Sequence, residues 1–377
     1  SLFGPLFGRT VPAEGVACSC HRRLPPHTQL QRGRPERETM GRLSASILAA
    51  AVAAPGARAK VCDGSSGQAP CFTLPSGPQI PAVAMGSWSG SYEDCDKEDY
   101  ACVQQHARFA TENWLHIGGR HIDTANDYRT QAAIGEVLSR SSYSREDMYL
   151  TTKCPGAMGY AATIQCADDN LQMLGQFGAK GVQYLDLLLI HFPFVMKPEC
   201  RFTRHSPACR PPNMPFVPVS KEALQETWRA MEDLKRFGVV KSIGVSDYNI
   251  SHLEATLETA KEPIDLHQVE WNPKTHDEAM LDFCKKHGIQ LQAWSPLGGA
   301  AGSVLSDPVV KGAAAAHGVS AAQAVLKWSI QRGVAVVVGT ANAQHAKGDL
   351  DLFGFNLTDA EVSAISALGA PAQPIVV

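Results

Sequence analysis

The 377-residue chain contains no apolar run of the roughly 18 residues that a membrane-spanning helix requires. Its formal net charge is only −3, so the charge balance gives no reason to expect a nucleic acid or an anionic membrane as a partner. Beyond residue 59 no cysteine has the C-x-x-C spacing of a zinc or redox site, and the histidines and acids lack the spacing of metal ligands. No serine or cysteine lies in a nucleophile elbow, which argues against nucleophilic hydrolysis. We therefore expect no metal site, no nucleic-acid partner and no membrane segment in the mature chain.

The first 59 residues differ in composition from the remainder. Residues 1–39 are rich in Arg, Pro and Gly, which is typical of a disordered leader or of sequence outside the working protein. Residues 40–59 have the order of a secretory signal peptide: a basic start, the apolar stretch Leu43–Ala54, and a small-x-small cleavage site at Ala57–Ala59. This order predicts the secretory pathway or the extracellular space. The alternatives are a bipartite organelle leader and an Ala-rich tail on a cytoplasmic protein.

The cysteines after residue 59 fall into close sequential couples. The couples are 62/71, 95/102, 154/166 and 200/209, and Cys284 is left over. In an oxidising lumen such couples form local disulfides. We expect disulfides for 62/71 and 200/209, which lie in Pro- and Gly-rich loops, whereas disulfides and buried thiols are both compatible with 95/102 and 154/166. An exported chain would also offer glycosylation sequons at Asn249 and Asn356.

From residue 76 to residue 370 short apolar runs alternate with amphipathic runs. Most of the apolar runs are continuous rather than alternating, which is typical of parallel strands covered on both faces. The expected strands are Val83–Met85, His121–Ala125, Met148–Lys153, Leu185–His191, Val240–Ser246, Ile264–Trp271, Ile289–Ser295 and Val334–Gly339. The expected helices include Asp99–Leu115, Gln131–Ser139, Thr163–Leu174, Lys221–Phe237, Ile250–Ala260, His276–His287 and Ala321–Arg332, and the glycines that follow four of them predict C-caps at Gly118, Gly238, Gly288 and Gly333.

Eight strands alternating with helices predict a closed (β/α)8 barrel over residues 76–370. Residues 60–75 then form a Cys-containing N-terminal segment and residues 371–377 a tail. A doubly wound open sheet is the alternative, but it requires a Gly-rich phosphate loop after its first strand, and no G-x-G-x-x-G occurs. The Pro-rich stretch from Pro193 to Pro218 is expected to be an extended loop at the barrel mouth.

Four chemically capable residues follow successive strands of this barrel. Asp123 closes "HIDTA", Lys153 ends "MYLTTK" and His191 ends "YLDLLLIH", while Tyr128 lies five residues after Asp123. Each has an ordinary structural explanation alone, but a parallel barrel brings the carboxyl ends of its strands to one rim. An ammonium near a phenol favours the phenolate and makes Tyr a better acid, a carboxylate holds that ammonium, and a neutral His orients a carbonyl oxygen. The set suits protonation of an oxygen as a hydride arrives.

Longer blocks give the chain a recognisable resemblance. "GRHIDTANDYRTQAAIG", "LTTK", "LDLLLIHFP", "RFGVVKSIGVSDYN", "HQVEWNP" and "AWSPLG" resemble, in order, the signature blocks of the aldo-keto reductases between Ser76 and about Leu368. The resemblance implies a (β/α)8 barrel and nicotinamide-dependent reduction of an aldehyde or ketone. It also implies a catalytic tetrad of Asp123, Tyr128, Lys153 and His191, with Tyr128 as the proton donor.

The resemblance also assigns binding residues. Ser246 and Gln268 match residues that bind the nicotinamide carboxamide, and Asp247 replaces the usual Asn. Trp294 stands where an aromatic ring, usually Tyr, stacks on the nicotinamide. Ser295 and Leu297 match the loop over the pyrophosphate, and Gly86, Ser87 and Trp88 match the loop after the first strand. Trp88, Tyr128, His191 and Phe192 are the expected substrate contacts; the apolar wall of Trp88 and Phe192 favours aromatic or aliphatic aldehydes over sugars.

The last strand departs from the family pattern. Gly339, Thr340, His345 and Asp349 stand where the family typically has Lys, Ser, Arg and Asn. The missing Lys and Arg are the usual clamp on the 2′-phosphate of NADP, and charge-assisted contacts are the strong ones. We expect NADP(H) from the family's habit, with NAD(H) as the alternative and Lys347 as a substitute cation. Gly119 replaces a usual aromatic, and there we expect a packing change.

Two other functions are compatible with the sequence. A catalytically weak or inactive relative, acting as a cofactor-binding module, would explain the altered clamp and the unusual leader. A barrel glycosidase would need paired carboxylates at strand ends, and Asp123 has no obvious partner of that kind. Neither the particular carbonyl substrate nor the oligomeric state can be predicted from these patterns.

Overall fold

The computed structural model describes residues 60–62, 70–88, 99–175, 182–197, 216–299, 304–340 and 342–371. Its internal contacts divide the chain into residues 1–43 and 44–377, and every described residue belongs to the second unit. The expected leader, the expected signal peptide and the Cys200/Cys209 couple lie outside the described residues.

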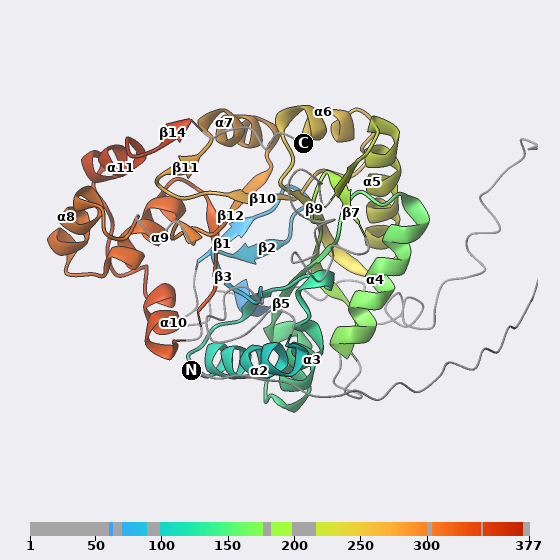
Figure 1. Cartoon of the computed structure of the whole chain (residues 1–377), viewed down its shortest axis with the longest axis horizontal. Helices are drawn as coiled ribbons and strands as arrows, with labels where there is room; N and C mark the ends of the chain where they lie inside the picture. Colours follow the sequence, from blue (N-terminus) through green and yellow to red (C-terminus); the bar gives the residue numbers. More distant parts are fainter. Residues whose placement is uncertain are drawn as a thin grey trace, which may run out of the picture. The chain divides into compact units, whose positions relative to one another are not determined.

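The second unit is built on a closed barrel of parallel strands (Figure 1). Around the barrel the strands run in the order β10-β12-β13-β3-β4-β5-β6-β9, and every neighbouring pair is parallel. Their bounds are β3 Val83–Gly86, β4 His121–Asp123, β5 Tyr149–Cys154, β6 Leu185–Ile190, β9 Val240–Ser246, β10 Leu266–Glu270, β12 Gln290–Trp294 and β13 Ala335–Val338. The (β/α)8 prediction is therefore confirmed, with each strand within a few residues of its expected place.

Helices surround the barrel strands. Their bounds are α2 Tyr100–His116, α3 Gln131–Arg140, α4 Tyr160–Gly175, α5 Lys221–Arg236, α6 Ile250–Leu257, α7 Glu278–His287, α8 Pro308–His317, α9 Ala321–Gln331, α10 Ala343–Leu350 and α11 Asp359–Ser366. The expected helix set did not include α8, α10 or α11. All three carry readable start signals, because Asp307 caps α8 ahead of Pro308, Asn342 caps α10, and Thr358 forms a capping box with Glu361 in α11.

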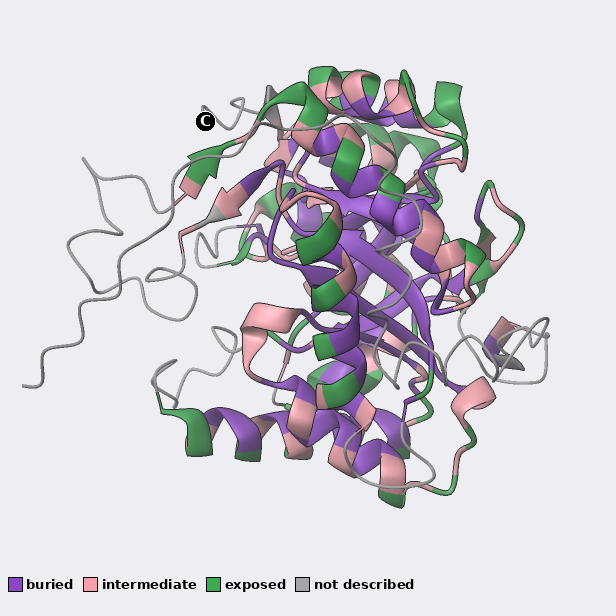
Figure 2. Cartoon of the chain, turned by 90° about the vertical axis from the view of Figure 1, so that its right-hand side faces the viewer, coloured by how far each residue is buried: buried purple, intermediate pink, exposed green. Residues whose placement is uncertain are grey.

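Burial explains why the strands are continuously apolar. All six residues of β5 and all six of β6 are buried, and Figure 2 shows the barrel strands mostly buried while the helices alternate between buried and exposed faces. A strand covered by helices outside and by packed side chains inside has no solvent face to alternate with. The polar residues found on these strands, Lys153 among them, are therefore buried at a cost that some partner has to offset.

A short antiparallel hairpin packs against one group of barrel residues. It joins β1 (Cys71–Thr73) to β2 (Gln79–Pro81), and Leu74 and Ile80 pack with Tyr149, Leu187 and Leu266. The turn η2 (Lys60–Cys62) is tied to this hairpin by a Cys62–Cys71 disulfide, as expected.

The other cysteines resolve the open alternatives. Cys154 at the end of β5 and Cys166 in α4 form a disulfide with a Cα–Cα distance of 5.9 Å, so they are not free thiols. Cys102 is also disulfide-bonded, whereas Cys95 lies outside the described residues. Cys284 is a buried free thiol, and burial raises its pKa to about 12, which leaves it chemically inert at neutral pH.

Two glycine predictions are met in detail. Gly118, Gly238, Gly288 and Gly333 all have positive φ angles, as helix C-caps require. At Gly119 a Cβ would lie 2.3 Å from the indole of Trp114, so that indole fills the space where a side chain would stand. This is the packing change expected where the family has an aromatic residue.

The two described ends of the Pro-rich stretch after β6 pair with each other. Its described parts include β7 (Phe194–Met196) and β8 (Phe216–Pro218), which pair in antiparallel fashion. Elsewhere β11 (Thr275–His276) pairs in parallel with β14 (Ala370–Pro371). Among the described residues, no helix combines the length and apolar character needed to cross a membrane.

Candidate active site

Three neighbouring strands deliver the expected tetrad to one end of the barrel. Asp123 is the last residue of β4, Lys153 is the fifth of six residues in β5, and His191 comes directly after β6. Because β4, β5 and β6 are adjacent and parallel, their carboxyl ends share one rim. Tyr128 reaches the same rim from the turn η4 (Asn126–Tyr128), which follows β4 after two residues.

A buried ion pair lies at the base of this group. The Nζ of Lys153 contacts Oδ1 of Asp123, and the two side chains are 0% and 2% exposed. The same Nζ donates to the carbonyl oxygen of Thr124 at 3.0 Å. The Nε2 of Gln268 donates to the other carboxylate oxygen of Asp123 at 2.9 Å. Each charge thus has hydrogen bonds beyond its ionic partner, the condition for a buried pair to persist.

The turn that carries Tyr128 is held by its backbone conformation and by hydrogen bonds from neighbouring side chains. Arg129 has a φ of 62°, the left-handed region that ends η4 and starts the approach to α3. The side-chain amide of Gln104 in α2 donates to the carbonyl oxygen of Arg129. One residue later, the hydroxyl of Thr130 lies 3.1 Å from the hydroxyls of both Ser87 and Thr124. The position of the phenol is therefore held by contacts from β3, β4 and α2.

Tyr128 meets His191 and Lys153 over the ion pair. Its hydroxyl lies 3.4 Å from Nε2 of His191, and the Nζ of Lys153 lies 5.0 Å from the centre of its ring. Burial raises the pKa of Tyr128 well above 10, and the carboxylates of Asp123, Asp127 and Asp247 raise it further. The net direction reflects burial and these carboxylates, and the expectation that the Lys153 ammonium makes Tyr128 a better acid stays a prediction.

A stack of aromatic rings continues from His191 along the mouth. The His191 and Phe192 rings are 4.1 Å apart and nearly parallel, and Phe192, Phe194 and Phe216 continue the stack at 4.9 and 4.2 Å. The stack joins β6 to the β7–β8 hairpin. Trp88, the other residue of the expected apolar wall, is 42% exposed after β3. Its place in the substrate site stays a prediction.

On the opposite side of the barrel, the carboxamide residues lie on paired strands. Ser246 at the end of β9 is in register with Gln268 in β10, and both are buried. The amide nitrogen of Gln268 donates to Asp123 and to Oε1 of Gln292. Its oxygen is therefore left to accept an N–H, while the Ser246 hydroxyl is able to donate. This donor set fits a nicotinamide carboxamide.

Two departures from the family pattern contact each other. The indole Nε1 of Trp294, at the end of β12, donates to Oδ1 of Asp247 at 2.8 Å. A carboxylate in place of Asn accepts this hydrogen bond, and it holds the indole in place of the usual phenol ring. Burial raises the pKa of Asp247 to about 6, although the Trp294 hydrogen bond acts in the opposite direction. Asp247 adopts a φ of 55°, so its backbone turns sharply after β9.

The remaining loop residues surround this region. Ser295 has a φ of 47° directly after Trp294, and Leu297 is half-buried in the same loop. Gly86 ends β3 beside Asp123, and a Cβ there would lie 2.9 Å from Val337 of β13. Ser87 is fully buried, and its backbone N–H donates to the Asp123 carbonyl oxygen at 3.0 Å. These residues therefore line the rim next to the tetrad.

The segment after β13 places its side chains differently from the expected clamp. Gly339 and His345 are exposed and Thr340 is half-buried. Asn342 caps α10, and its Oδ1 accepts from the backbone N–H groups of Gln344 and His345. These are the groups that a helix N-terminus would otherwise offer to a phosphate. Lys347 is exposed one turn further along α10, as the nearby cation.

Asp349 does not join this exposed group, because it is only 4% exposed on α10. Burial raises its pKa to about 7 from 3.8. A carboxyl whose folded pKa is raised contributes stability that is lost as the pH rises, here between about pH 4 and pH 7. The wild type should therefore lose stability between pH 4 and pH 8, and Asp349→Asn should not. We expect the unfolding free energy at pH 8 minus that at pH 4 to be about 2–4 kcal/mol more positive in Asp349→Asn than in the wild type.

Urea unfolding at the two pH values, with exposed Asp351→Asn as the matched control, measures this difference. An equal effect of both substitutions would contradict the burial of an ionisable Asp349.

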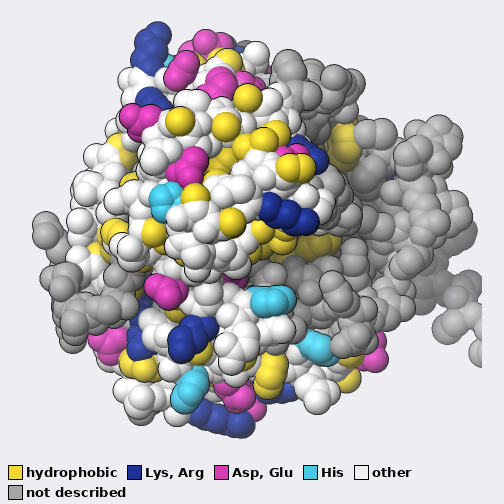
Figure 3. Space-filling model, turned by 90° about the vertical axis from the view of Figure 1, so that its left-hand side faces the viewer, with side chains coloured by type: hydrophobic (Ala, Val, Ile, Leu, Met, Phe, Trp, Pro, Cys, Tyr) yellow, Lys and Arg dark blue, Asp and Glu magenta, His cyan; other side chains and the backbone are white. Residues whose placement is uncertain are grey.

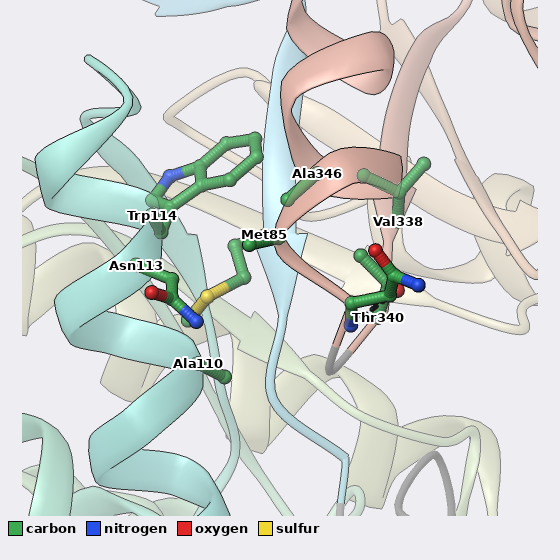
Figure 4. Close-up of a pocket in the computed structure, with 9 residues that line it drawn as sticks. Met85, Ala110, Asn113, Trp114, Val338, Thr340 and Ala346 are labelled. Carbon is green, nitrogen blue, oxygen red and sulfur yellow. Dashed lines mark hydrogen bonds between the residues drawn. The ribbon is translucent and has the colours of Figure 1, made fainter.

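An apolar pocket lies beside this segment, away from the tetrad. Figure 4 shows it between α2 and α10, with Met85 of β3 behind it and Trp114 and Val338 at its sides. Thr340 and Asn342 also line it, so it borders the segment where the clamp was expected. On the face drawn in Figure 3, the described Lys and Arg side chains are interspersed with Asp and Glu.

Two residues near the barrel mouth, Asp127 and Asn342, were not singled out from the sequence. Asp127 directly precedes Tyr128 in η4, and its Oδ1 is 3.3 Å from Nδ1 of His191. Asn342 occupies the α10 N-terminus. Asn342 had a signal, since Asn is among the residues preferred at helix N-caps. Asp127 had none, because its partner is 64 positions away in the chain and only the fold brings them together.

Comparisons with known proteins agree with this geometry. A family described as the aldo/keto reductase family matches residues 83–370. An aldo-keto reductase of Mycolicibacterium smegmatis is 33% identical over 300 residues, which cover 79% of this chain and 93% of that protein. A D-galacturonate reductase of Fragaria ananassa is 31% identical, with 77% of this chain and 86% of that protein covered. The crystal structure of a Bombyx mori aldo-keto reductase in complex with NADP has a TM-score of 0.69 and 29% identity, and the match covers 83% of this chain and 96% of that one.

Proposed function

The chain belongs to the aldo/keto reductase family, and we propose that it reduces an aldehyde or ketone to the alcohol with Tyr128 as proton donor. The observation that carries this proposal is the cluster at the rim. The Tyr128 hydroxyl lies 3.4 Å from His191 Nε2, above the buried Lys153–Asp123 pair. The intact cluster favours an enzyme over a cofactor-binding module.

Tyr128, Lys153 and His191 each have a distinct role in the proposed reaction. A bound nicotinamide cofactor supplies a hydride to the carbonyl carbon. Tyr128 gives its phenolic proton to the carbonyl oxygen, and the Lys153 ammonium, held by Asp123, faces the ring on which negative charge then develops. The 3.4 Å separation allows His191 and Tyr128 to contact the same oxygen. Burial and the neighbouring carboxylates raise the pKa of Tyr128, so the phenol carries the proton that the proposed reduction needs.

We propose an apolar, ring-containing or aliphatic aldehyde as the substrate class. The stacked rings of Phe192 and Phe194 extend from His191, and flat aromatic faces favour stacking with another ring. The Fragaria relative is named for a sugar acid, which shows that substrate choice varies among relatives. Comparing benzaldehyde-type substrates with a sugar aldehyde of equal reactivity tests this choice, and a preference for the sugar would contradict it.

The cofactor residues support a nicotinamide cofactor with weak discrimination between NADPH and NADH. The Bombyx relative was crystallised with NADP. In this chain Gly339 and His345 replace two clamp cations, and Asn342 occupies the helix N–H groups nearby. The register of Ser246 with Gln268, and the hydrogen bond that holds Trp294 to Asp247, support these residues as the ones that would hold the nicotinamide.

We expect wild-type kcat/KM values for NADPH and NADH to lie within about 10-fold of each other, because each missing charge-assisted contact removes roughly a factor of 10. Gly339→Lys combined with His345→Arg should raise the NADPH-to-NADH ratio by about 10-fold or more. Cofactor titration by quenching of tryptophan fluorescence gives the same ratio without turnover. A strong wild-type preference for NADPH, unchanged by the two substitutions, would contradict the account of the lost clamp.

A further inference from the structure

A chain of side-chain hydrogen bonds crosses the inside of the barrel near its carboxyl rim. Asp123 ends β4 and Gln268 lies in β10, which is four strands away in either direction around the barrel. The Nε2 of Gln268 nevertheless donates to Oδ2 of Asp123 at 2.9 Å. The same Nε2 donates at 2.8 Å to Oε1 of Gln292, the residue of β12 that is in register with Gln268. These two bonds connect the ion pair at Asp123 to the opposite wall of the barrel.

The carboxylate of Asp123 sets the direction of this chain. Its Oδ1 contacts the Lys153 ammonium, and an ionised carboxylate can only accept hydrogen bonds. Gln268 therefore has to turn its amide nitrogen, and not its oxygen, toward Asp123. That nitrogen carries two hydrogens, one for each of its acceptors, so Gln292 in turn has to present its oxygen to Gln268.

The amide of Gln292 is not explained by stability alone. Gln292 is fully buried, and its own Nε2 has no hydrogen-bond partner in the described part of the chain. A buried donor without a partner is destabilising, and an apolar side chain at this position would avoid that cost. The one polar contact that Gln292 makes through its side chain within the described residues is the one that holds Gln268. The orientation of Gln268 is therefore what the amide at position 292 provides.

This orientation decides which atom Gln268 can offer to a cofactor. Both hydrogens of its nitrogen are used inside the barrel, so only Oε1 is left, and it is an acceptor. Ser246 is in register with Gln268 on the other side of β10, and its hydroxyl is able to donate. A nicotinamide carboxamide would then have to give its N–H to Gln268 and turn its oxygen toward Ser246.

We propose that Gln292 is a positioning residue for the cofactor: its Oε1 holds the amide of Gln268 so that Gln268 selects the N–H of the nicotinamide carboxamide. The inference rests on the proposed carbonyl reduction and names the cofactor group that the site recognises. Without an acceptor at position 292, one hydrogen of Gln268 is buried and unpaired, and the bond to Asp123 alone leaves the amide plane free to turn.

Binding of oxidised NADP and of its 3-acetylpyridine analogue to the full chain tests the proposal without turnover. The analogue carries a methyl ketone in place of the carboxamide, so it keeps the carbonyl oxygen and lacks the N–H. Titration by quenching of tryptophan fluorescence should give the wild type a Kd about 5- to 10-fold lower for NADP than for the analogue, the effect of one hydrogen bond. Gln292→Met should reduce this ratio to about 2-fold or less.

Two further variants separate positioning from stability. Gln292→Glu keeps an oxygen acceptor beside Gln268 and should retain the wild-type ratio. Gln290→Met is the matched control, because it removes an amide from the same strand whose Nε2 donates to the carbonyl oxygens of Leu291 and Gly333. It should keep the wild-type ratio even where its melting temperature falls.

The outcomes distinguish the two ideas. A wild type that binds both compounds equally well would overturn the orientation of Gln268. An unchanged ratio in Gln292→Met, or a ratio lost in both Gln292→Glu and Gln290→Met, would overturn the role of Gln292 while the reductase proposal stands. A wild type that binds neither compound would count against the nicotinamide cofactor, and therefore against the reductase proposal itself.

Discussion

Replacing Tyr128 with Phe is expected to lower the rate of carbonyl reduction by about 10²- to 10⁴-fold, the usual contribution of a positioned general acid. The substitution keeps the ring that lies 5.0 Å from Lys153 and removes only the hydroxyl that faces His191. Cofactor affinity should therefore be unchanged, and the loss should appear in kcat. Initial rates with NADPH and an aromatic aldehyde, together with a cofactor titration, measure both quantities.

Tyr149→Phe is the matched control for this prediction. It also removes a buried phenol hydroxyl, but from the start of β5, among the apolar residues that pack against the β1–β2 hairpin. It should leave the rate close to wild type. A Tyr128→Phe enzyme that keeps more than about a tenth of the wild-type rate would show that another group protonates the oxygen.

Replacing Lys153 with Met is expected to damage both stability and activity. Lys153 is fully buried, and its removal leaves Asp123 buried with only the Gln268 hydrogen bond on its outer oxygen. Breaking a buried pair from one side typically costs about 3–5 kcal/mol. For a domain of this size that corresponds to roughly 6–10 °C in the melting temperature. Turnover should fall with it, because no ammonium then faces the phenolate that forms at Tyr128.

A double substitution separates these two effects. Asp123→Asn combined with Lys153→Met removes both charges and should recover much of the stability while turnover stays low. Lys286→Met, at an exposed lysine of α7, is the control for loss of one positive charge and should change neither quantity appreciably. If Lys153→Met melted at the wild-type temperature, the Lys153–Asp123 pair would not be the structural base of the site.

Much of the architecture is predictable because it rests on local patterns. Continuous apolar runs identified all eight barrel strands, and glycines after helices identified their C-caps. The helices α8, α10 and α11 were not predicted because they are short and weakly amphipathic, so mainly their caps mark them. The parallel order of β4, β5 and β6 was sufficient to bring Asp123, Lys153 and His191 together.

What could not be predicted depends on side chains that meet across the barrel. The Trp294–Asp247 hydrogen bond joins two residues that both depart from the family pattern and lie 47 positions apart in the chain. The direction of the Tyr128 pKa depends on the sum of burial and three carboxylates, which a sequence does not supply. The approach of Asp127 Oδ1 to His191 Nδ1 at 3.3 Å joins a turn after β4 to the residue that follows β6, and only the fold brings these two positions together.

The most direct test of the reductase proposal follows the hydride itself. The full chain is incubated with an aromatic aldehyde and a reduced nicotinamide cofactor that carries deuterium at C4 of the ring. Proton NMR of the products should show deuterium on the carbinol carbon in proportion to the cofactor oxidised, and Tyr128→Phe should give almost none. Cofactor oxidation without deuterium in the alcohol, or tight cofactor binding with no alcohol formed, would contradict the account of Tyr128, His191, Lys153 and Asp123 as a carbonyl reductase site.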